Sequence, residues 1–300
     1  MLALSSMNAD MNIDRQTANR TFSRIAALYD QHAALQAAVG ERLLERLDEI
    51  RFQPQRILDL GCGTGIQSQA LKDRFPDAAI VAMDLVLPML RQAGKRRGWW
   101  KKRFEPVVGN AMQLPLASST FDLVHSNLML QWCDDIESAL ANLRRVLKPG
   151  GLLLVSTLGP DTLNELRRAG TEINKDFFTG HLTDVQRLGS ALTRAGFAEP
   201  VLDTDWLTTT YATPSDLLKD LECSGAIQAT GEGQQDPGEY LNRQELVDAY
   251  QSFCRQDGHY PATWEIVYAS AWSPDEGQPI RTGQGEEASI SVASLKVRKR

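Results

Sequence analysis

Cysteine is scarce in this sequence, and recognisable patterns of metal ligands are missing. The 300 residues include only four cysteines and four histidines. The cysteines form no CxxC pair and the histidines no HxxxH or HExxH pair, so neither a disulfide framework nor a zinc site is predicted. We therefore expect reduced thiols and no metal.

An excess of positive charge and long apolar runs are also missing. The 32 Lys and Arg residues face 38 Asp and Glu residues, which gives a net charge of -6 and disfavours binding along a nucleic-acid backbone. No apolar run approaches the ~18 residues of a membrane span, and the N-terminal apolar stretch is too short for a signal peptide. These absences predict a cytoplasmic protein with neither a nucleic-acid nor a membrane partner.

What the chain does contain is an alternation of short apolar runs and helical patterns between residues 55 and 157. This alternation is typical of a parallel sheet with crossover helices. Strands are expected at 56–60, 79–84, 105–108, 121–126 and 152–157, and helices at 64–75, 88–97 and 136–147. Pro149 and the two glycines after it predict a turn that stops the last helix. We predict an α/β fold with a doubly wound, mostly parallel sheet.

Helical segments are expected to flank this core. A helix is predicted over residues 14–50, because apolar side chains recur there at three- and four-residue steps. Further strands are expected at 201–211 and 264–272, and helices at 214–226 and 242–256. The predicted organisation is a mobile N-terminus (1–13), an N-terminal helical lid (14–50), a main domain (51–272) with a lid insertion at about 212–258, and a flexible tail (273–300).

The strongest local signal is the sequence DLGCGTG at residues 59–65, directly after the first predicted strand. Its glycines allow a sharp turn and a close approach to a ligand, which the free N–H groups at the helix start face. A nicotinamide-dinucleotide fingerprint would have its third glycine at the position of Ile66, not at Gly65. The pattern therefore favours a ligand seat of another kind, and a tight turn without a ligand is the alternative.

Asp84 ends the second predicted strand, nineteen positions after Gly65. A carboxylate there can accept hydrogen bonds from both hydroxyls of a ribose. The alternative is that Asp84 caps the helix that follows.

Taken together, these features resemble the class I S-adenosylmethionine-dependent methyltransferases. The resemblance rests on residues 59–65, Asp84, GNA at 109–111 and LRRVLKPGG at 143–151. It implies S-adenosylmethionine as co-substrate, with Asp59, Gly61, Gly63 and Gly65 near the methionine part, Asp84 at the ribose, and Leu85, Asn110 and Ala111 at the adenine. Cys62 and Asn127 complete the expected binding site. Many members have Asp where this chain has Asn110, but an amide can still hydrogen-bond an adenine edge.

Four further blocks, spread along the chain, resemble a narrower family, the malonyl-acyl-carrier-protein O-methyltransferases of biotin synthesis. They are residues 22–36, SNLMLQWC at 126–133, 157–167 and YPATW at 260–264. The resemblance implies that the acceptor is the free carboxylate of a malonyl group on acyl carrier protein. Such a carboxylate, with a pKa of ~4, is already ionised at neutral pH, so no general base is expected.

The residues expected to position the acceptor are Tyr29, Arg24, His32, Gln131, Trp132 and Arg167. A buried carboxylate needs a cation or several donors, and the two arginines are the preferred cations. Each of these residues also has a plainer interpretation, as a solvated arginine, a core aromatic residue or an interfacial histidine. One departure from the family is Glu222, which stands near a position where the family often has lysine.

The densest basic cluster consists of Lys95, Arg96, Arg97, Lys101, Lys102 and Arg103. It could dock an acidic carrier protein. The alternatives are a solvated helix end, or nucleic-acid stacking through Trp99 and Trp100. We expect a monomer.

Other functions remain open at the level of sequence. The main alternative is a methyltransferase-like assembly factor or hydroxylase that acts on a protein partner. Another small-molecule methyltransferase and a nicotinamide oxidoreductase are further alternatives.

Overall fold

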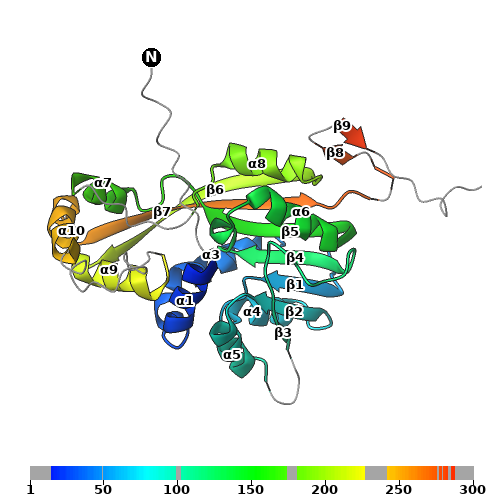
Figure 1. Cartoon of the computed structure of the whole chain (residues 1–300), viewed down its shortest axis with the longest axis horizontal. Coiled ribbons are helices and arrows are strands. Elements are labelled where there is room, and N and C mark those ends of the chain that lie inside the picture. Colours follow the sequence, from blue (N-terminus) through cyan, green and yellow to red (C-terminus); the bar gives the residue numbers. More distant parts are fainter. Residues whose placement is uncertain are drawn as a thin grey trace, which may run out of the picture.

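A seven-stranded sheet forms the centre of the protein (Figure 1). The computed structural model describes residues 15–48, 50–98, 103–173, 181–226, 242–275, 277–278, 280–282 and 285–287. The strands are β1 (Arg56–Leu60), β2 (Ala79–Asp84), β3 (Glu105–Val108), β4 (Phe121–Asn127), β5 (Leu147–Leu158), β6 (Ala198–Tyr211) and β7 (Tyr260–Trp272). Their order is β3-β2-β1-β4-β5-β7-β6, with β1 to β5 parallel and β7 antiparallel to both neighbours. The predicted α/β fold is confirmed.

Helices cover both faces of this sheet. Successive residues of β1 point to opposite faces, so Ile57 and Leu58 belong to two different buried apolar clusters. The cluster around Ile57 includes side chains of α3 (Ala34–Glu45), α4 (Ile66–Arg74) and α5 (Leu87–Arg96). The cluster around Leu58 includes side chains of α6 (Ile136–Val146) and α8 (Val185–Arg194). Because both faces are buried, the central strands are mostly apolar, which is why they could be recognised in the sequence.

The N-terminal segment differs from the single helix expected over residues 14–50. It forms α1 (Arg15–Ile25), α2 (Tyr29–His32) and α3, with bends between them. The sequence contains no helix breaker at the first bend. Instead, Ile25 and Ala26 are buried against Val86 and Met89 at the start of α5, so tertiary packing outweighs helix propensity here.

The turn expected at Pro149 is also different. Helix α6 ends at Val146, close to the predicted end, but β5 begins at the next residue and runs through Gly150 and Gly151. The register between β4 and β5 shifts in this stretch, and Gly150 has φ +70°. The glycines thus absorb an irregularity inside a strand, which is another use of their conformational freedom.

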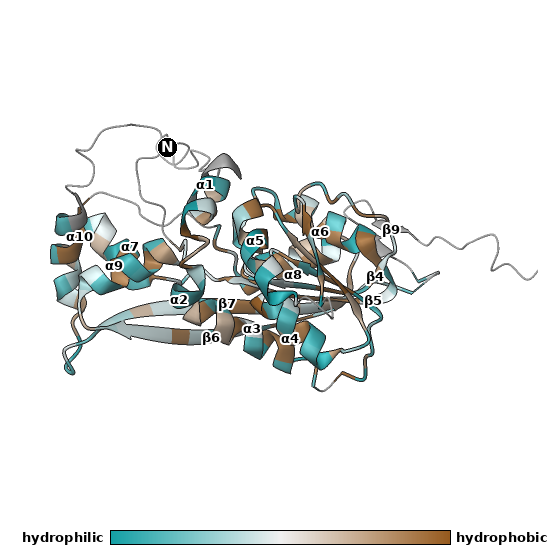
Figure 2. Ribbon diagram, turned by 90° about the horizontal axis from the view of Figure 1, so that it is seen from below, coloured by the Kyte–Doolittle hydropathy of each residue, from teal (hydrophilic) through white to brown (hydrophobic). Residues whose placement is uncertain are grey.

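Helices lie between β6 and β7, in the segment for which a lid insertion was predicted. Its described helices are α9 (Pro214–Cys223) and α10 (Asn242–Tyr250), followed by the short 3-10 helix Gln251–Phe253. Together with α7 (Asn164–Glu172), which the sequence did not predict, they gather at one end of the long strands β6 and β7, as Figures 1 and 2 show. Helix α8 was not predicted either.

Only part of the predicted tail is described. Strands β8 (Ile280–Thr282) and β9 (Gly285–Glu287) pair antiparallel there, which differs from a wholly flexible tail. Most of the rest, and the N-terminus at 1–13, lie outside the described residues. Within the described part of the chain, no helix is both long and apolar enough to cross a bilayer.

Candidate functional site

The glycine loop joins the end of β1 to α4 and is held against the end of β2. The N–H groups of Gly61 and Cys62 both donate to the carbonyl of Met83, at 2.8 and 3.0 Å. Gly61, Gly63 and Gly65 all have positive φ, between +54° and +82°. Residues with a side chain adopt this conformation only at a cost, so the loop requires its glycines.

The three glycines have different surroundings. A Cβ on Gly61 would come within 2.4 Å of Met129 Cγ, and one on Gly65 within 3.0 Å of Ala93 and Phe104. A Cβ on Gly63 would meet no protein atom within 4 Å. Gly63 therefore faces open space that a ligand can fill, whereas Gly65 serves the turn and the packing of α4 against α5.

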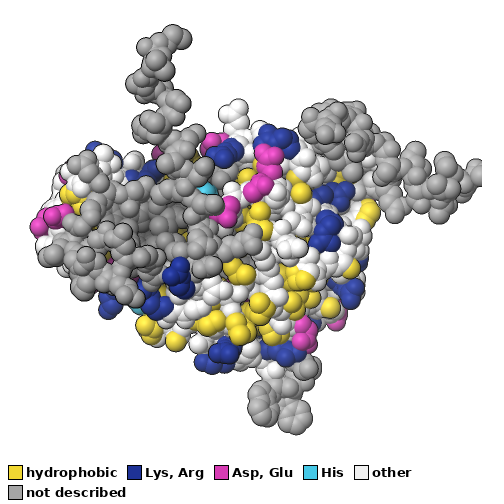
Figure 3. Space-filling view, viewed as in Figure 1, with side chains coloured by type: hydrophobic (Ala, Val, Ile, Leu, Met, Phe, Trp, Pro, Cys, Tyr) yellow, Lys and Arg dark blue, Asp and Glu magenta, His cyan; other side chains and the backbone are white. Residues whose placement is uncertain are grey.

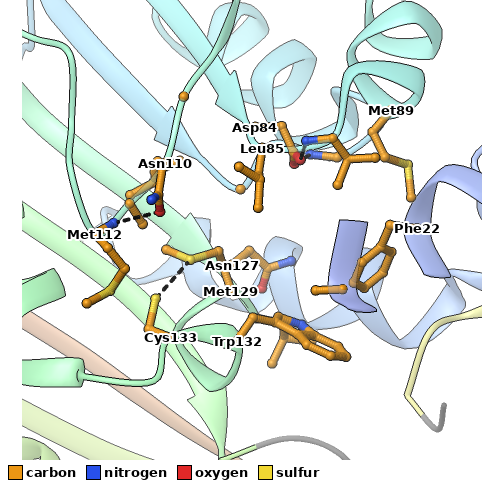
Figure 4. A pocket seen from close by; sticks show the side chains of 18 of the residues that line it. Phe22, Asp84, Leu85, Met89, Asn110, Met112, Asn127, Met129, Trp132 and Cys133 are labelled. Atoms are coloured by element: carbon orange, nitrogen blue, oxygen red, sulfur yellow. Dashed lines mark hydrogen bonds between the residues drawn. The ribbon is translucent and has the colours of Figure 1, made fainter. Parts of the chain in front are cut away.

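Asp84 lies beside this loop, at the end of β2. One carboxylate oxygen accepts from the N–H of Gly63 and the other from the N–H of Val86, both at 2.8 Å (Figure 4). Val86 is the N-cap of α5, so Asp84 links two loops and is not itself the cap. Burial raises the pKa of Asp84 above its usual value, an effect that backbone hydrogen bonds partly offset. Each oxygen can still accept another hydrogen bond.

A crevice of about 910 Å³, including its open mouth, begins at Asp84 and the glycine loop. Seven of the predicted cofactor residues line it: Gly61, Gly63, Asp84, Leu85, Asn110, Ala111 and Asn127. The side chains of Met89, Met112 and Met129 make much of its wall apolar (Figure 4). The side chain of Asn110 accepts from the N–H of Met112 at 3.0 Å, which fixes its orientation.

A second cavity, which we call the glycine-loop pocket, has a volume of about 430 Å³, including its open mouth. Its lining includes Asp59 and Cys62, two further predicted residues. The Asp59 carboxylate is only 1% exposed; it accepts from Ser68 Oγ at 2.5 Å and lies 2.8 Å from His125 Nδ1. Asp59, at the start of the loop, is therefore linked to α4 through Ser68 and to β4 through His125. Burial raises the pKa of the Cys62 thiol, which keeps this thiol protonated.

A third cavity, the aromatic pocket, has a volume of about 440 Å³, including its open mouth. It is lined by Phe22, Tyr29, Leu35, Gln36, Leu128, Gln131, Trp132, Leu158, Ser224, Gly225, Ala226 and Trp264. None of these residues is charged. The ring of Phe22 packs edge-on against Trp132, with centroids 5.1 Å apart, and against Tyr29 at 6.2 Å. Among the described residues, Tyr29 alone lines all three cavities.

Comparisons with known proteins agree with this geometry. A family described as "Methyltransferase domain" matches residues 58–155. The chain is 42% identical to the malonyl-[acyl-carrier protein] O-methyltransferase of Gallionella capsiferriformans, over 87% of this chain and 92% of that one. It is 40% identical to the same enzyme of Xylella fastidiosa, over 94% and 95%. The chain belongs to the malonyl-acyl-carrier-protein O-methyltransferase family. It is therefore an S-adenosylmethionine-dependent O-methyltransferase.

Solved structures share the fold of this family member. A putative methyltransferase from Bacillus halodurans matches with a TM-score of 0.56 at 21% identity, over 79% of this chain and 99% of that one. A phosphoethanolamine N-methyltransferase of Haemonchus contortus, solved with S-adenosyl-L-methionine, matches with a TM-score of 0.54 at 19% identity, over 89% and 60%. At this identity the likeness shows the fold alone.

The described residues fit S-adenosylmethionine. The open space at Gly63 admits a ligand against the backbone, and Asp84 has acceptor capacity left for two ribose hydroxyls. Leu85 and Met112 offer an apolar slot beside Asn110, which suits a purine. Carboxylates line the crevice and the glycine-loop pocket, which suits a sulfonium cation.

Of the predicted acceptor residues, the structure brings together Tyr29, Gln131 and Trp132 in the aromatic pocket. It does not place Arg24, His32 or Arg167 in any of the three cavities. Arg24 is exposed at the end of α1, and Arg167 donates to the carbonyl of Pro160.

His32 instead joins α2 to the insertion. Its Nδ1 lies 2.7 Å from Asp220 Oδ1, and the other oxygen of Asp220 accepts from the hydroxyl of Tyr211 at 2.8 Å. Glu222, the departure from the family pattern, lies in the last turn of α9 and lines none of the three cavities.

The basic cluster at 95–103 is described only in part. Arg96 forms an ion pair with Asp30 on α2, Arg97 with Glu105, and Arg103 with Asp73. These three arginines are therefore paired with carboxylates of this chain. The predicted docking role would depend more on Lys95, Lys101 and Lys102, and the last two lie outside the described part of the chain.

Two site residues escaped the sequence analysis. Gln36 and Gln67 line the glycine-loop pocket, and Gln36 also lines the aromatic pocket. A polar residue on an amphipathic helix is ordinarily solvated, so the only available signal was the position of Gln36 inside the N-terminal family block.

Proposed function

We propose that this enzyme transfers a methyl group from S-adenosylmethionine to the free carboxylate of a malonyl group on acyl carrier protein. The observation that carries the proposal is the meeting of three cavities at Tyr29. Two of them are lined by carboxylates and suit a cationic donor, while the third is uncharged and suits an acyl acceptor. The names of the relatives support the choice of malonyl-acyl carrier protein.

The reaction requires no general base from the protein. S-adenosylmethionine supplies an electrophilic methyl group, and the acceptor carboxylate is already ionised at neutral pH. The side chains must therefore hold the acceptor in line with the methyl group and exclude water, because hydration would lower the nucleophilicity of the carboxylate. Phe22, Trp132 and Tyr29 form an aromatic wall suited to that task.

Tyr29 also offers a donor at the junction. Burial, together with the nearby Asp84 and Asp30, raises the pKa of its hydroxyl well above the usual value. The hydroxyl therefore stays protonated at neutral pH and can donate to a carboxylate. Together with the indole N–H of Trp132, it gives the aromatic pocket uncharged donors for an anion.

The absence of a charged residue from the lining of the aromatic pocket fits the charge balance of the reaction. A carboxylate and a sulfonium neutralise each other as the methyl group moves. A fixed cation beside the carboxylate would stabilise the reactants more than the transition state, which would slow the step. We infer that the donor's own sulfonium is the counter-charge of the acceptor.

The carrier would approach at the mouth of the crevice. Leu28, between α1 and α2, and Leu87, at the start of α5, are neighbours in sequence of the crevice residues Tyr29 and Val86 and are 49% and 46% exposed. Figure 3 shows hydrophobic side chains gathered on this face between scattered Lys and Arg side chains. The helical segments α1–α2 and α9 would act as the covering lid. A role in biotin synthesis, a cytoplasmic location, a monomeric state and the lack of nucleic-acid or membrane partners remain predictions.

Mass spectrometry of the carrier tests this function. We expect malonyl-acyl carrier protein to gain one methyl ester when enzyme and S-adenosylmethionine are added. Acetyl-acyl carrier protein, which has no free carboxylate, should not change. An unchanged malonyl carrier at saturating co-substrate would reject the proposal. If S-adenosylhomocysteine were also not formed, the methyltransferase-like assembly factor would be favoured.

A further inference from the structure

Two residues that line the glycine-loop pocket each carry a buried side-chain oxygen without a hydrogen-bond partner. These oxygens are Oε1 of Gln36 and Oε1 of Gln67. A buried acceptor without a donor costs about 1–3 kcal/mol. Two such acceptors on residues that line one cavity indicate a ligand group there that carries several N–H donors.

Gln67 is held in place by its neighbour on α3. The side chain is 9% exposed, and its amide occupies the space beside Gly40, where an added Cβ would lie 1.9 Å from Gln67 Nε2. A glycine in the middle of a helix costs about 1 kcal/mol relative to alanine. Gly40 therefore makes room for the Gln67 amide, including its unpartnered Oε1, and Gln67 also lines the pocket.

Gln36 stands between two cavities. Apart from Tyr29, it is the only described residue that lines both the glycine-loop pocket and the aromatic pocket. Its backbone carbonyl accepts from Asn127 Nδ2 at 2.8 Å, and Asn127 Oδ1 accepts from Ser156 Oγ at 2.8 Å. The first turn of α3 is thus tied to the ends of β4 and β5, which fixes where the Gln36 side chain begins.

We propose that Gln36 aligns the two substrates with each other. Its Oε1, with that of Gln67, accepts from the α-ammonium group of S-adenosylmethionine, and its Nε2 donates to the acceptor carboxylate in the aromatic pocket. This assignment rests on the proposed function for its acceptor half. A neutral amide suits the position because it offers an acceptor to a cation on one side and a donor to an anion on the other. Neither a carboxylate nor an ammonium group could do both.

Three variants separate the two halves of this role: Gln36→Glu, Gln36→Met and Gln67→Leu. Gln36→Glu keeps an acceptor for the ammonium group but repels the acceptor carboxylate. We expect it to bind S-adenosylmethionine at least as well as the wild type by calorimetry, while the KM for malonyl-acyl carrier protein rises ~10-fold or more. Gln36→Met should lose ~10-fold in both measurements. Gln67→Leu should weaken S-adenosylmethionine binding alone.

A purely structural role would give another pattern. If Gln36→Glu lowered donor affinity as much as Gln36→Met does, or if the KM for the carrier did not change in either variant, the proposal would be wrong. Thermal unfolding of each variant shows whether the fold is intact. If the wild type did not methylate the malonyl carrier at all, the proposed function and the proposed contact of Gln36 with the acceptor carboxylate would both be wrong. The donor half would still be decided by calorimetry, since binding needs no acceptor.

Discussion

The donor side and the acceptor side of the site are built in opposite ways. The donor side uses the ends of neighbouring parallel strands, short loops, backbone N–H groups and the carboxylates Asp59 and Asp84. The acceptor side collects uncharged side chains from five separate parts of the chain, including Phe22, Trp132 and Trp264. The donor keeps its cationic, sugar-bearing shape from one methyltransferase to another, so a local motif can hold it. The acceptor differs between enzymes and is recognised by a pocket that only the complete fold assembles.

The sharpest test of the donor side is Asp84→Ala. The substitution removes the acceptor for the ribose hydroxyls and also leaves the N–H groups of Gly63 and Val86 without their partner. We expect the affinity for S-adenosylmethionine to fall at least ~100-fold, or about 3 kcal/mol. Isothermal titration calorimetry measures this directly. Wild-type affinity would mean that Asp84 only organises the loops.

The matching test of the acceptor side is Gly225→Ala. Gly225 has φ +77°, and an added Cβ would lie 2.6 Å from Phe22 Cε1. The backbone strain is about 1–2 kcal/mol, and a displaced Phe22 loses its ring contact with Trp132, worth about 0.5–1.5 kcal/mol. We expect kcat/KM for the malonyl carrier to fall ~10-fold, with a donor affinity that changes less than ~3-fold.

Gly94→Ala is the control for that substitution. Gly94 lies within α5, and a Cβ there would meet no atom within 4 Å. Alanine should therefore stabilise the helix by up to about 1 kcal/mol and leave both activity and donor affinity unchanged. An equal loss of activity in both variants would show that the effect of Gly225→Ala is not specific to Phe22.

This contrast also explains how much the sequence could predict. The strands at 56–60, 79–84 and 105–108 have the expected bounds, because each contains a short apolar run that can be recognised locally in the sequence. The glycine loop was equally readable, since its turn needs glycine at fixed positions. Seven of the ten predicted cofactor residues line the crevice, and Asp59 and Cys62 line the adjoining pocket.

The acceptor side could not be predicted in the same way. The bend after Ile25 comes directly before Tyr29 and separates α1 from α2, and no helix-breaking residue marks it in the sequence. An arginine was expected for the carboxylate on general electrostatic grounds, yet Arg24 and Arg167 lie outside the three cavities. For Gln36 the only signal was its position in the N-terminal family block, because its importance comes from the two cavities that it lines.

The smallest expected effect concerns pH and again separates the two sides. Burial raises the pKa of Asp84 above the usual aspartate value. In the window between the unfolded and the raised folded pKa, the folded protein holds more protons than the unfolded chain, so this group makes folding less favourable as pH rises.

The affinity for the donor changes with pH in the opposite direction. It rises with pH, because only the ionised Asp84 carboxylate accepts fully from two hydroxyls. We expect the affinity for S-adenosylmethionine to fall several-fold as pH drops into that window, at a higher pH than an ordinary aspartate would give. Calorimetry at a series of pH values measures this affinity. In the Asp84→Asn variant the affinity should not change with pH in this window. A wild-type affinity that was equally independent of pH would mean that Asp84 does not control donor binding.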